Sequence, residues 1–103
     1  MDFADLQARL QQFADERDWN RFHSPKNLAM ALSVEAAELV EIFQWLTEDE
    51  SRRLNDVQKG AAADEVADVL IYLARFAAMA GIDVDAAVAS KLARNAVKYP
   101  VRR

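Results

Sequence analysis

Two pairs of acidic residues interrupt two long apolar stretches of the sequence. Glu35 and Glu38 lie within the run from Leu28 to Leu46, and Glu65 and Asp68 lead into the run VLIYLARFAAMAG. Residues three positions apart in an α-helix lie about 60° apart around the axis, so both members of each pair project to one side. The sequence therefore predicts two helix faces that each carry a pair of carboxylates.

Each acidic pair repels itself, and the repulsion grows where apolar neighbours displace water. Few cations stand nearby to compensate, since Lys26 lies well before Glu35 and Arg75 is the one base in the second run. A hard divalent cation is the simplest compensator. Mg²⁺ prefers carboxylate oxygens and keeps waters that a substrate's phosphate oxygens can replace. This pattern predicts a magnesium site acting on phosphate, with Mn²⁺ able to substitute. The alternative is a solvated acidic face.

The segments that carry these acids have the periodicity of helices. We expect helices from Asp2 to about Asp18, from Pro25 to about Leu46, from about Val57 to Ala80, and from Asp83 or Asp85 to just before Pro100. Ser24 and Pro25 form an N-cap followed by proline at the first helical position, Thr47 and Glu50 form a possible capping box, and Gly81 is a C-terminal stop. The predicted fold class is all-α, a small bundle of four main helices in a single domain over residues 1–103.

Composition narrows the classes of protein that fit. With 103 residues, 52% of them hydrophobic, and two glycines and two prolines, the chain fits one compact helical domain. It contains no cysteine and a single histidine, His23, which excludes thiolate zinc sites and histidine-rich metal sites. A formal net charge of −4 argues against nucleic acid as a partner.

Charge and hydropathy also bear on partners and location. No stretch is apolar enough for a membrane span, and the charged N-terminal residues differ from a signal peptide, so we expect a cytoplasmic protein without a membrane partner. From Lys91 onward every charged residue is basic, and this segment could meet a small polyanion or serve as a solvated tail: Lys91, Arg94, Lys98, Arg102 and Arg103.

The second and third expected helices are apolar nearly all round. A chain of this size cannot hide so much apolar surface within one monomer. We therefore expect the fold to be completed by oligomerisation, as a homodimer or homotetramer. A tight four-helix monomer is the alternative.

Four sequence blocks in order resemble the MazG-like superfamily of all-α nucleotide pyrophosphohydrolases, and most closely its dCTP pyrophosphatase branch. The blocks are ERDWNRFHSPKNLAMAL, EAAELVEIFQW, DEVADVLIYL and SKLARNAVKYP, and the resemblance extends from Phe13 to Pro100. It implies magnesium-dependent hydrolysis of a nucleoside triphosphate, such as dCTP or a modified pyrimidine analogue, to the monophosphate and pyrophosphate. It also implies a role in nucleotide-pool housekeeping.

The resemblance implies roles for particular residues. The metal ligands would be Glu35, Glu38, Glu65 and Asp68, and a catalytic glutamate, Glu35 or Glu38, would double as general base. Residues implied in base and sugar recognition are Trp19, His23, Trp45, Tyr72 and Asn95, and those implied in triphosphate contact are Lys91 and Lys98. Each of these residues has an ordinary structural alternative: the tryptophans and Tyr72 as packing residues, His23 as a loop brace, Asn95 as a surface residue, and Lys98 as a packing residue at the end of the bundle.

One position departs from the resemblance. Leu10 stands where the vertebrate enzymes of the branch have a histidine, so a hydrogen-bonding ring is replaced by an aliphatic side chain. Strict cytosine selectivity is therefore in doubt, while the metal chemistry is untouched.

Two other classes of protein share part of this pattern. A non-catalytic helical module that binds a basic partner through its acidic pairs would show no metal dependence. A carboxylate-bridged di-iron bundle normally requires Glu-x-x-His on two helices, and no such motif is present here.

Overall fold

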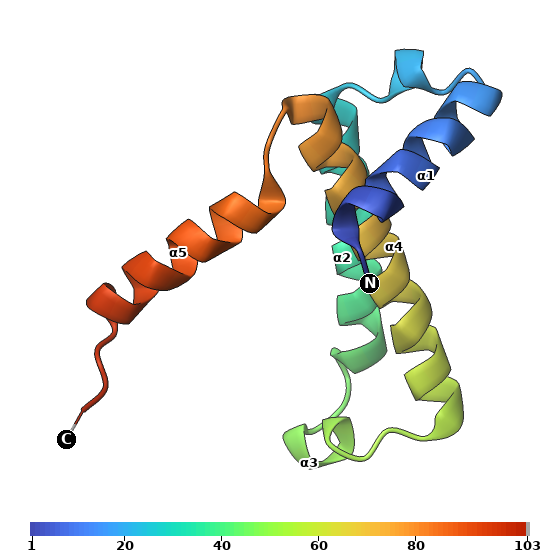
Figure 1. The fold of residues 1–103 in the computed structure, drawn as a ribbon. Helices are drawn as coiled ribbons and strands as arrows, with labels where there is room; N and C mark the ends of the chain where they lie inside the picture. Colours follow the sequence, from blue (N-terminus) through green and yellow to red (C-terminus); the bar gives the residue numbers. More distant parts are fainter. Residues whose placement is uncertain (103) are drawn as a thin grey trace.

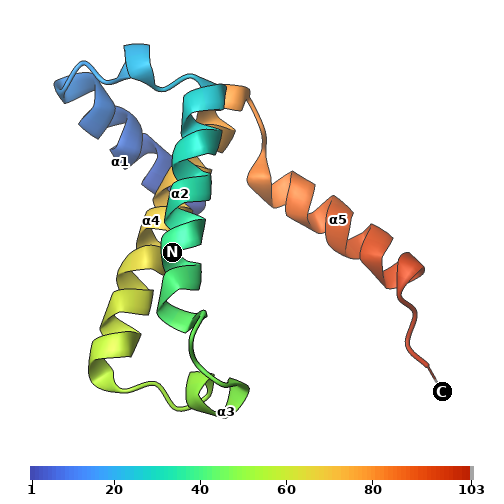
Figure 2. The ribbon, with the colours of Figure 1, turned by 180° about the vertical axis from the view of Figure 1, so that it is seen from behind.

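A pair of long helices forms the centre of the molecule. The structure, a computed structural model, describes residues 1–102, and Arg103 of the basic C-terminal segment lies outside them. Helix α2 (Pro25–Phe43) and helix α4 (Asp56–Ala80) run side by side in opposite directions, and α1 (Phe3–Glu16) crosses α4 near its C-terminal half (Figures 1 and 2). The acidic pairs lie on this central pair of helices.

Side-chain caps fix where the two central helices begin. The Ser24 hydroxyl accepts a hydrogen bond from the backbone N–H of Asn27 at 3.2 Å, and Pro25 occupies the first position of α2. Helix α4 begins with a capping box in which Asn55 and Gln58 bond each other's backbone N–H groups at 2.8 and 3.0 Å. It ends at Gly81, whose φ of 71° closes the helix in the left-handed conformation.

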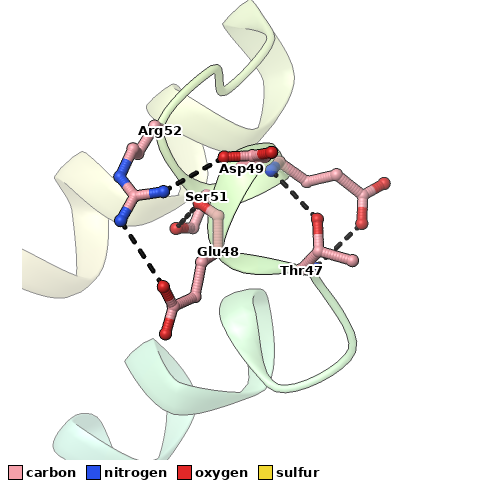
Figure 3. A network of polar contacts seen from close by, with 6 residues as sticks. Thr47, Glu48, Asp49, Ser51 and Arg52 are labelled. Atoms are coloured by element: carbon pink, nitrogen blue, oxygen red, sulfur yellow. Dashed lines mark hydrogen bonds and ion pairs between the residues drawn. The ribbon is translucent and has the colours of Figure 1, made fainter.

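A short turn, α3 (Glu48–Ser51), joins the two central helices. Thr47 and Glu50 form its capping box, and the Arg52 guanidinium pairs with Glu48 and Asp49 across the turn (Figure 3). These ion pairs are exposed, so they contribute little to stability. Their effect is local: the turn has a defined end from which α4 can start.

The link between α1 and α2 changes direction at Asp18. This residue has a φ of 53°, a left-handed conformation that aspartate tolerates better than most residues. The chain then forms a 3₁₀ turn, η1 (Asn20–Phe22), and the backbone N–H of Trp19 bonds the carbonyl of Ala14 at 2.9 Å. Trp19 and His23 are thereby held over the crossing of α1 and α4.

Helix α5 (Val84–Lys98) projects away from the other helices (Figure 1). It leaves Val88, Leu92 and Val97 exposed, at 51%, 64% and 82% of their surface. The chain has an accessible surface of 8039 Å², whereas a compact monomer of this mass exposes about 5,800 Å². Its radius of gyration is 16.8 Å, against about 13 Å for a compact domain of this length. One copy of the chain is therefore more extended than a compact domain of its length.

The predicted all-α class and its four main helices are confirmed, with corrections at helix ends. α1 stops at Glu16 rather than Asp18, because the chain turns at Asp18. α2 stops at Phe43 rather than Leu46, so Trp45 lies in the turn after the helix. The 3₁₀ turn η1 was not expected. Among the described residues, no helix is both long and apolar enough to cross a bilayer.

Candidate metal and nucleotide site

Three glutamates from the two central helices meet at one point. Glu35 and Glu38 of α2 and Glu65 of α4 each place a carboxylate oxygen within 4.8 Å of the others, and all three side chains are half-buried. The antiparallel packing of α2 on α4 brings them together from positions thirty residues apart in sequence. The two acidic faces of the central helices thus meet through these three residues.

The carboxylates are held in an unfavourable electrostatic environment. Burial raises the pKa of Glu65 to about 7, with further contributions from Glu35 and Glu38. For Glu35, the polar contact with Glu65 lowers the pKa, but burial and repulsion from Glu38 and Asp68 outweigh it and raise the pKa overall.

Two observations bear on whether a metal ion fits here. The Oε2 atoms of Glu35 and Glu65 are buried and have no hydrogen-bond partner in the structure. Among residues 1–102, no lysine or arginine forms an ion pair with either glutamate. Buried carboxylate oxygens without partners are rare because desolvation is costly. An all-oxygen donor set of this kind suits a hard divalent cation such as Mg²⁺ or Mn²⁺.

Asp68, the fourth predicted ligand, lies one turn beyond Glu65 on α4. Its oxygens do not fall within the close cluster of three, although its charge acts on Glu35. Next to the cluster is an open hollow of about 520 Å³ whose lining includes four acids, Glu38, Glu41, Asp64 and Glu65. A triphosphate could approach this acidic hollow only together with cations.

A second cavity, of about 470 Å³, lies at the crossing of α1 and α4. We call it the aromatic pocket; its lining is mainly apolar and includes Leu10, Phe13, Trp19, His23, Tyr72 and Arg75. Phe13 and Trp19 meet edge to face with ring centroids 5.4 Å apart, and the His23 ring lies 6.1 Å from that of Trp19. Three predicted recognition residues, Trp19, His23 and Tyr72, thus line one cavity. Leu10, the position that departs from the family resemblance, lines it as well.

The carboxylate cluster and the aromatic pocket are joined by one face of α4. Glu65, Asp68, Tyr72 and Arg75 follow one another at spacings of three and four residues, which places them along a single stripe. From Glu65 to Tyr72 the helix rises about 10 Å. This distance is comparable to that from a nucleotide's phosphates to its base.

Arg75 is a site residue that the sequence reasoning did not identify. It is 3% exposed, lines the aromatic pocket, and donates hydrogen bonds to Gln11, Asn20 and His23. The signal available in the sequence was its position as a lone base in the apolar run VLIYLARFAAMAG. Its contacts come from α1 and η1, and pattern analysis of one helix could not supply them.

Four predicted substrate-binding residues do not line either cavity. Trp45 is 87% exposed in the turn after α2, and Lys91, Asn95 and Lys98 lie on the projecting helix α5. The Lys98 amine sits 5.3 Å from the ring centroid of Tyr99. Within one copy of the chain, the roles assigned to these four residues stay predictions.

The all-helical fold and the carboxylate cluster agree with the MazG-like family that the sequence blocks resemble. The family's model matches residues 30–103, and the chain belongs to this family.

Known proteins that resemble the chain agree with this assignment. It is 44% identical to the dCTP pyrophosphatase 1 of Rattus norvegicus over 92 residues, covering 87% of this chain and 54% of the relative. It is also 44% identical to the human dCTP pyrophosphatase 1 over 91 residues, covering 86% and 54%. The chain thus spans about half the length of these relatives. A crystal structure of a pyrophosphatase from Archaeoglobus fulgidus superposes with a TM-score of 0.89 at 43% identity, covering 95% of this chain and 92% of that one.

Proposed function

We propose that the chain is a divalent-metal-dependent nucleoside triphosphate pyrophosphohydrolase that cuts between the α and β phosphates. The observation that carries this proposal is the cluster of Glu35, Glu38 and Glu65, with two buried oxygens lacking partners, in a member of the MazG-like family. The names of its relatives, dCTP pyrophosphatase and pyrophosphatase, support the reaction type.

Glu35, Glu38 and Glu65 would hold the metal, with Asp68 completing the set. Mg²⁺ or Mn²⁺ bound there would supply the positive charge that neutralises the phosphate oxygens. A glutamate of α2, Glu35 or Glu38, orients a water and accepts its proton as the water oxygen attacks phosphorus. The bridging bond between the α and β phosphates breaks, and the products are the monophosphate, pyrophosphate and one proton.

The aromatic pocket is proposed to take the nucleobase. Trp19 and Phe13 line it with aromatic rings, and Tyr72 lies two turns from Glu65, at the distance that a nucleotide requires. Leu10 lines this pocket, so an aliphatic side chain would contact the base at the position where the vertebrate enzymes of the dCTP pyrophosphatase branch have a histidine. We infer a pyrimidine deoxynucleotide, dCTP or a modified analogue, as the substrate, and housekeeping of the cytoplasmic nucleotide pool as the role.

We also propose that the working form is a homodimer or homotetramer. The excess accessible surface of a single copy and the projecting α5 support this proposal. No nucleic acid or membrane partner is proposed, in keeping with the net charge of −4.

The proposed reaction is tested by incubating the chain with a panel of nucleoside triphosphates and Mg²⁺ and following the products by ³¹P NMR. We expect equal amounts of monophosphate and pyrophosphate, fastest with a pyrimidine deoxynucleotide, and no turnover after removal of the metal by EDTA. Release of orthophosphate alone, or equal turnover in EDTA, would contradict the proposal.

A further inference from the structure

Arg75 is a buried cation without a carboxylate in direct contact. Among the described residues it forms no ion pair, and its guanidinium donates instead to three neutral acceptors, Gln11 Oε1, Asn20 Oδ1 and His23 Nδ1. The nearest acid in the network is Asp15, one bond further out, where hydrogen bonds from Asn20 at 2.6 Å and Gln11 at 2.7 Å lower its pKa. Burying a charge in this way costs desolvation free energy, so Arg75 should make a contribution to the site that offsets this cost.

The bond to His23 fixes the state of the only histidine in the chain. Arg75 Nε lies 3.0 Å from His23 Nδ1, and a guanidinium can donate but cannot accept. Nδ1 must therefore carry no proton, and the proton of the neutral ring lies on Nε2. Burial, and to a lesser extent the charge of Arg75, also lower the pKa of His23, so the ring stays neutral near pH 7.

The other ring nitrogen is available to a ligand. His23 lines the aromatic pocket, and its Nε2 forms no hydrogen bond with residues 1–102. In the described part of the chain, the buried side-chain polar atoms without a partner are the Oε2 atoms of Glu35 and Glu65. Since Nε2 has no partner and is not one of these buried atoms, it is in contact with solvent. The polar side chains around the pocket are rich in donors: Arg9, Trp19 and Arg75 can only donate, and Tyr72 can do both. Such a lining matches a ligand that presents acceptors.

We propose that Arg75 is a positioning residue that locks His23 as a neutral Nε2–H donor for a carbonyl oxygen or unprotonated ring nitrogen of the nucleobase. This inference rests on the proposed function, since it takes the aromatic pocket to be the base site. It assigns His23 a hydrogen-bonding role in recognition and no role in proton transfer.

The first test needs no variant. Long-range ¹H–¹⁵N NMR spectra of the single histidine, in the untagged chain at pH 7.5, report which ring nitrogen carries the proton. We expect Nδ1 to be unprotonated and Nε2 protonated, with the Nε2 resonance moving when a non-hydrolysable triphosphate analogue binds. A proton on Nδ1, or an unmoved Nε2 resonance in the saturated complex, would overturn the proposal.

The second test uses substitutions that separate donation from ring packing. His23→Phe keeps the ring and removes the donor, so KM should rise about tenfold with kcat little changed, as for the loss of one hydrogen bond to substrate. His23→Gln can accept from Arg75 through its carbonyl and donate through its amide, so it should recover most of that loss. Equal losses in the two variants would contradict a donor role.

The third test links Arg75 to His23. Arg75→Met should release the tautomer, raise KM by less than His23→Phe does, and add nothing further in the double variant, because Arg75 acts only through the hydrogen bond that His23 donates. Additive losses would show that Arg75 acts independently of His23. Arg53→Met, at an exposed arginine far from the pocket, is the matched control. If Arg75→Met does not fold, the NMR measurement and the comparison of His23→Phe with His23→Gln still test the proposal.

The outcomes separate this inference from the proposed function. If no triphosphate is hydrolysed under any condition, the proposed function fails whatever the tautomer is. If hydrolysis proceeds normally while Nδ1 carries the proton, the role of Arg75 fails alone.

Discussion

Tyr72 lies two helical turns after Glu65 on the same face of α4, about 10 Å along the axis. Glu65 belongs to the carboxylate cluster and Tyr72 to the aromatic pocket. One rigid helix therefore sets the distance between the proposed metal and the proposed base. Because the two ends are separate, substitutions at the cluster should reduce kcat, and substitutions at the pocket should chiefly raise KM.

Glu38→Gln tests the metal end. The amide keeps the volume of the side chain and removes one charged ligand, so activity should fall at least about a hundredfold while the helical circular dichroism persists. The control is Glu48→Gln, which removes a charge from the exposed α3 turn and should leave turnover unchanged. Wild-type turnover in Glu38→Gln would show that Glu38 is not a ligand.

The raised pKa of Glu65 predicts that metal binding depends on pH. A protonated carboxyl group does not ligate, and the pKa of Glu65 is about 7 because of burial and its acidic neighbours. The apparent affinity for Mg²⁺, measured by calorimetry, should therefore rise as the pH increases through 7 and level off above it. In Glu65→Gln the affinity should be lower and its dependence on pH around 7 largely lost. A wild-type affinity that is flat between pH 6 and 8 would contradict this role of Glu65.

The exposed apolar face of α5 predicts an assembly. Light scattering at micromolar concentration should give at least twice the 11.6 kDa mass of the chain. Leu92→Asp places a charge on a side chain that is 64% exposed in one copy, and it should shift the assembly toward smaller species if α5 is covered by a second copy. Arg53→Asp, in the link after α3, is the control. An 11.6 kDa particle in the wild type would show that the chain is a monomer.

Much of the fold could be predicted from the sequence because its signals are local. Ser24 and Pro25 mark the start of α2, and Gly81 marks the end of α4, through backbone chemistry that involves only near neighbours. The end of α2 was harder, since Gln44, Trp45 and Leu46 are compatible with a helix. The position of α5 could not be derived, because it depends on what packs against its apolar face.

The candidate site likewise has one part that the sequence predicts and another part that it does not. Helical spacing placed Glu35 beside Glu38 on one side of α2, and the structure adds Glu65 across the helix pair. The Arg75 network could not be derived, because its acceptors come from α1 and η1, more than fifty residues earlier in the chain. Contacts between distant elements depend on tertiary packing, which the periodicity of a single helix does not report.

Trp45 is the predicted recognition residue whose role the fold leaves most open. A helix continuing to Leu46, as the sequence predicts, would place Trp45 two turns after Glu38 and on the same side of the helix. The helix ends at Phe43, and the indole is 87% exposed, outside the lining of the aromatic pocket. An indole so exposed is available to stack on a base or to pack against a second copy of the chain.

Trp45→Ala distinguishes these two roles. Stacking on a base is worth on the order of 1 to 3 kcal/mol, so its loss should raise KM about five- to a hundredfold. We expect that result, with magnesium affinity and particle mass unchanged. A fall in particle mass or in the unfolding temperature would instead identify Trp45 as a packing residue. Normal KM and normal mass together would exclude both roles and leave Trp19, which lines the aromatic pocket, as the stacking partner. Trp19→Ala, measured in parallel, should raise KM in either case, because Trp19 lines the proposed base site.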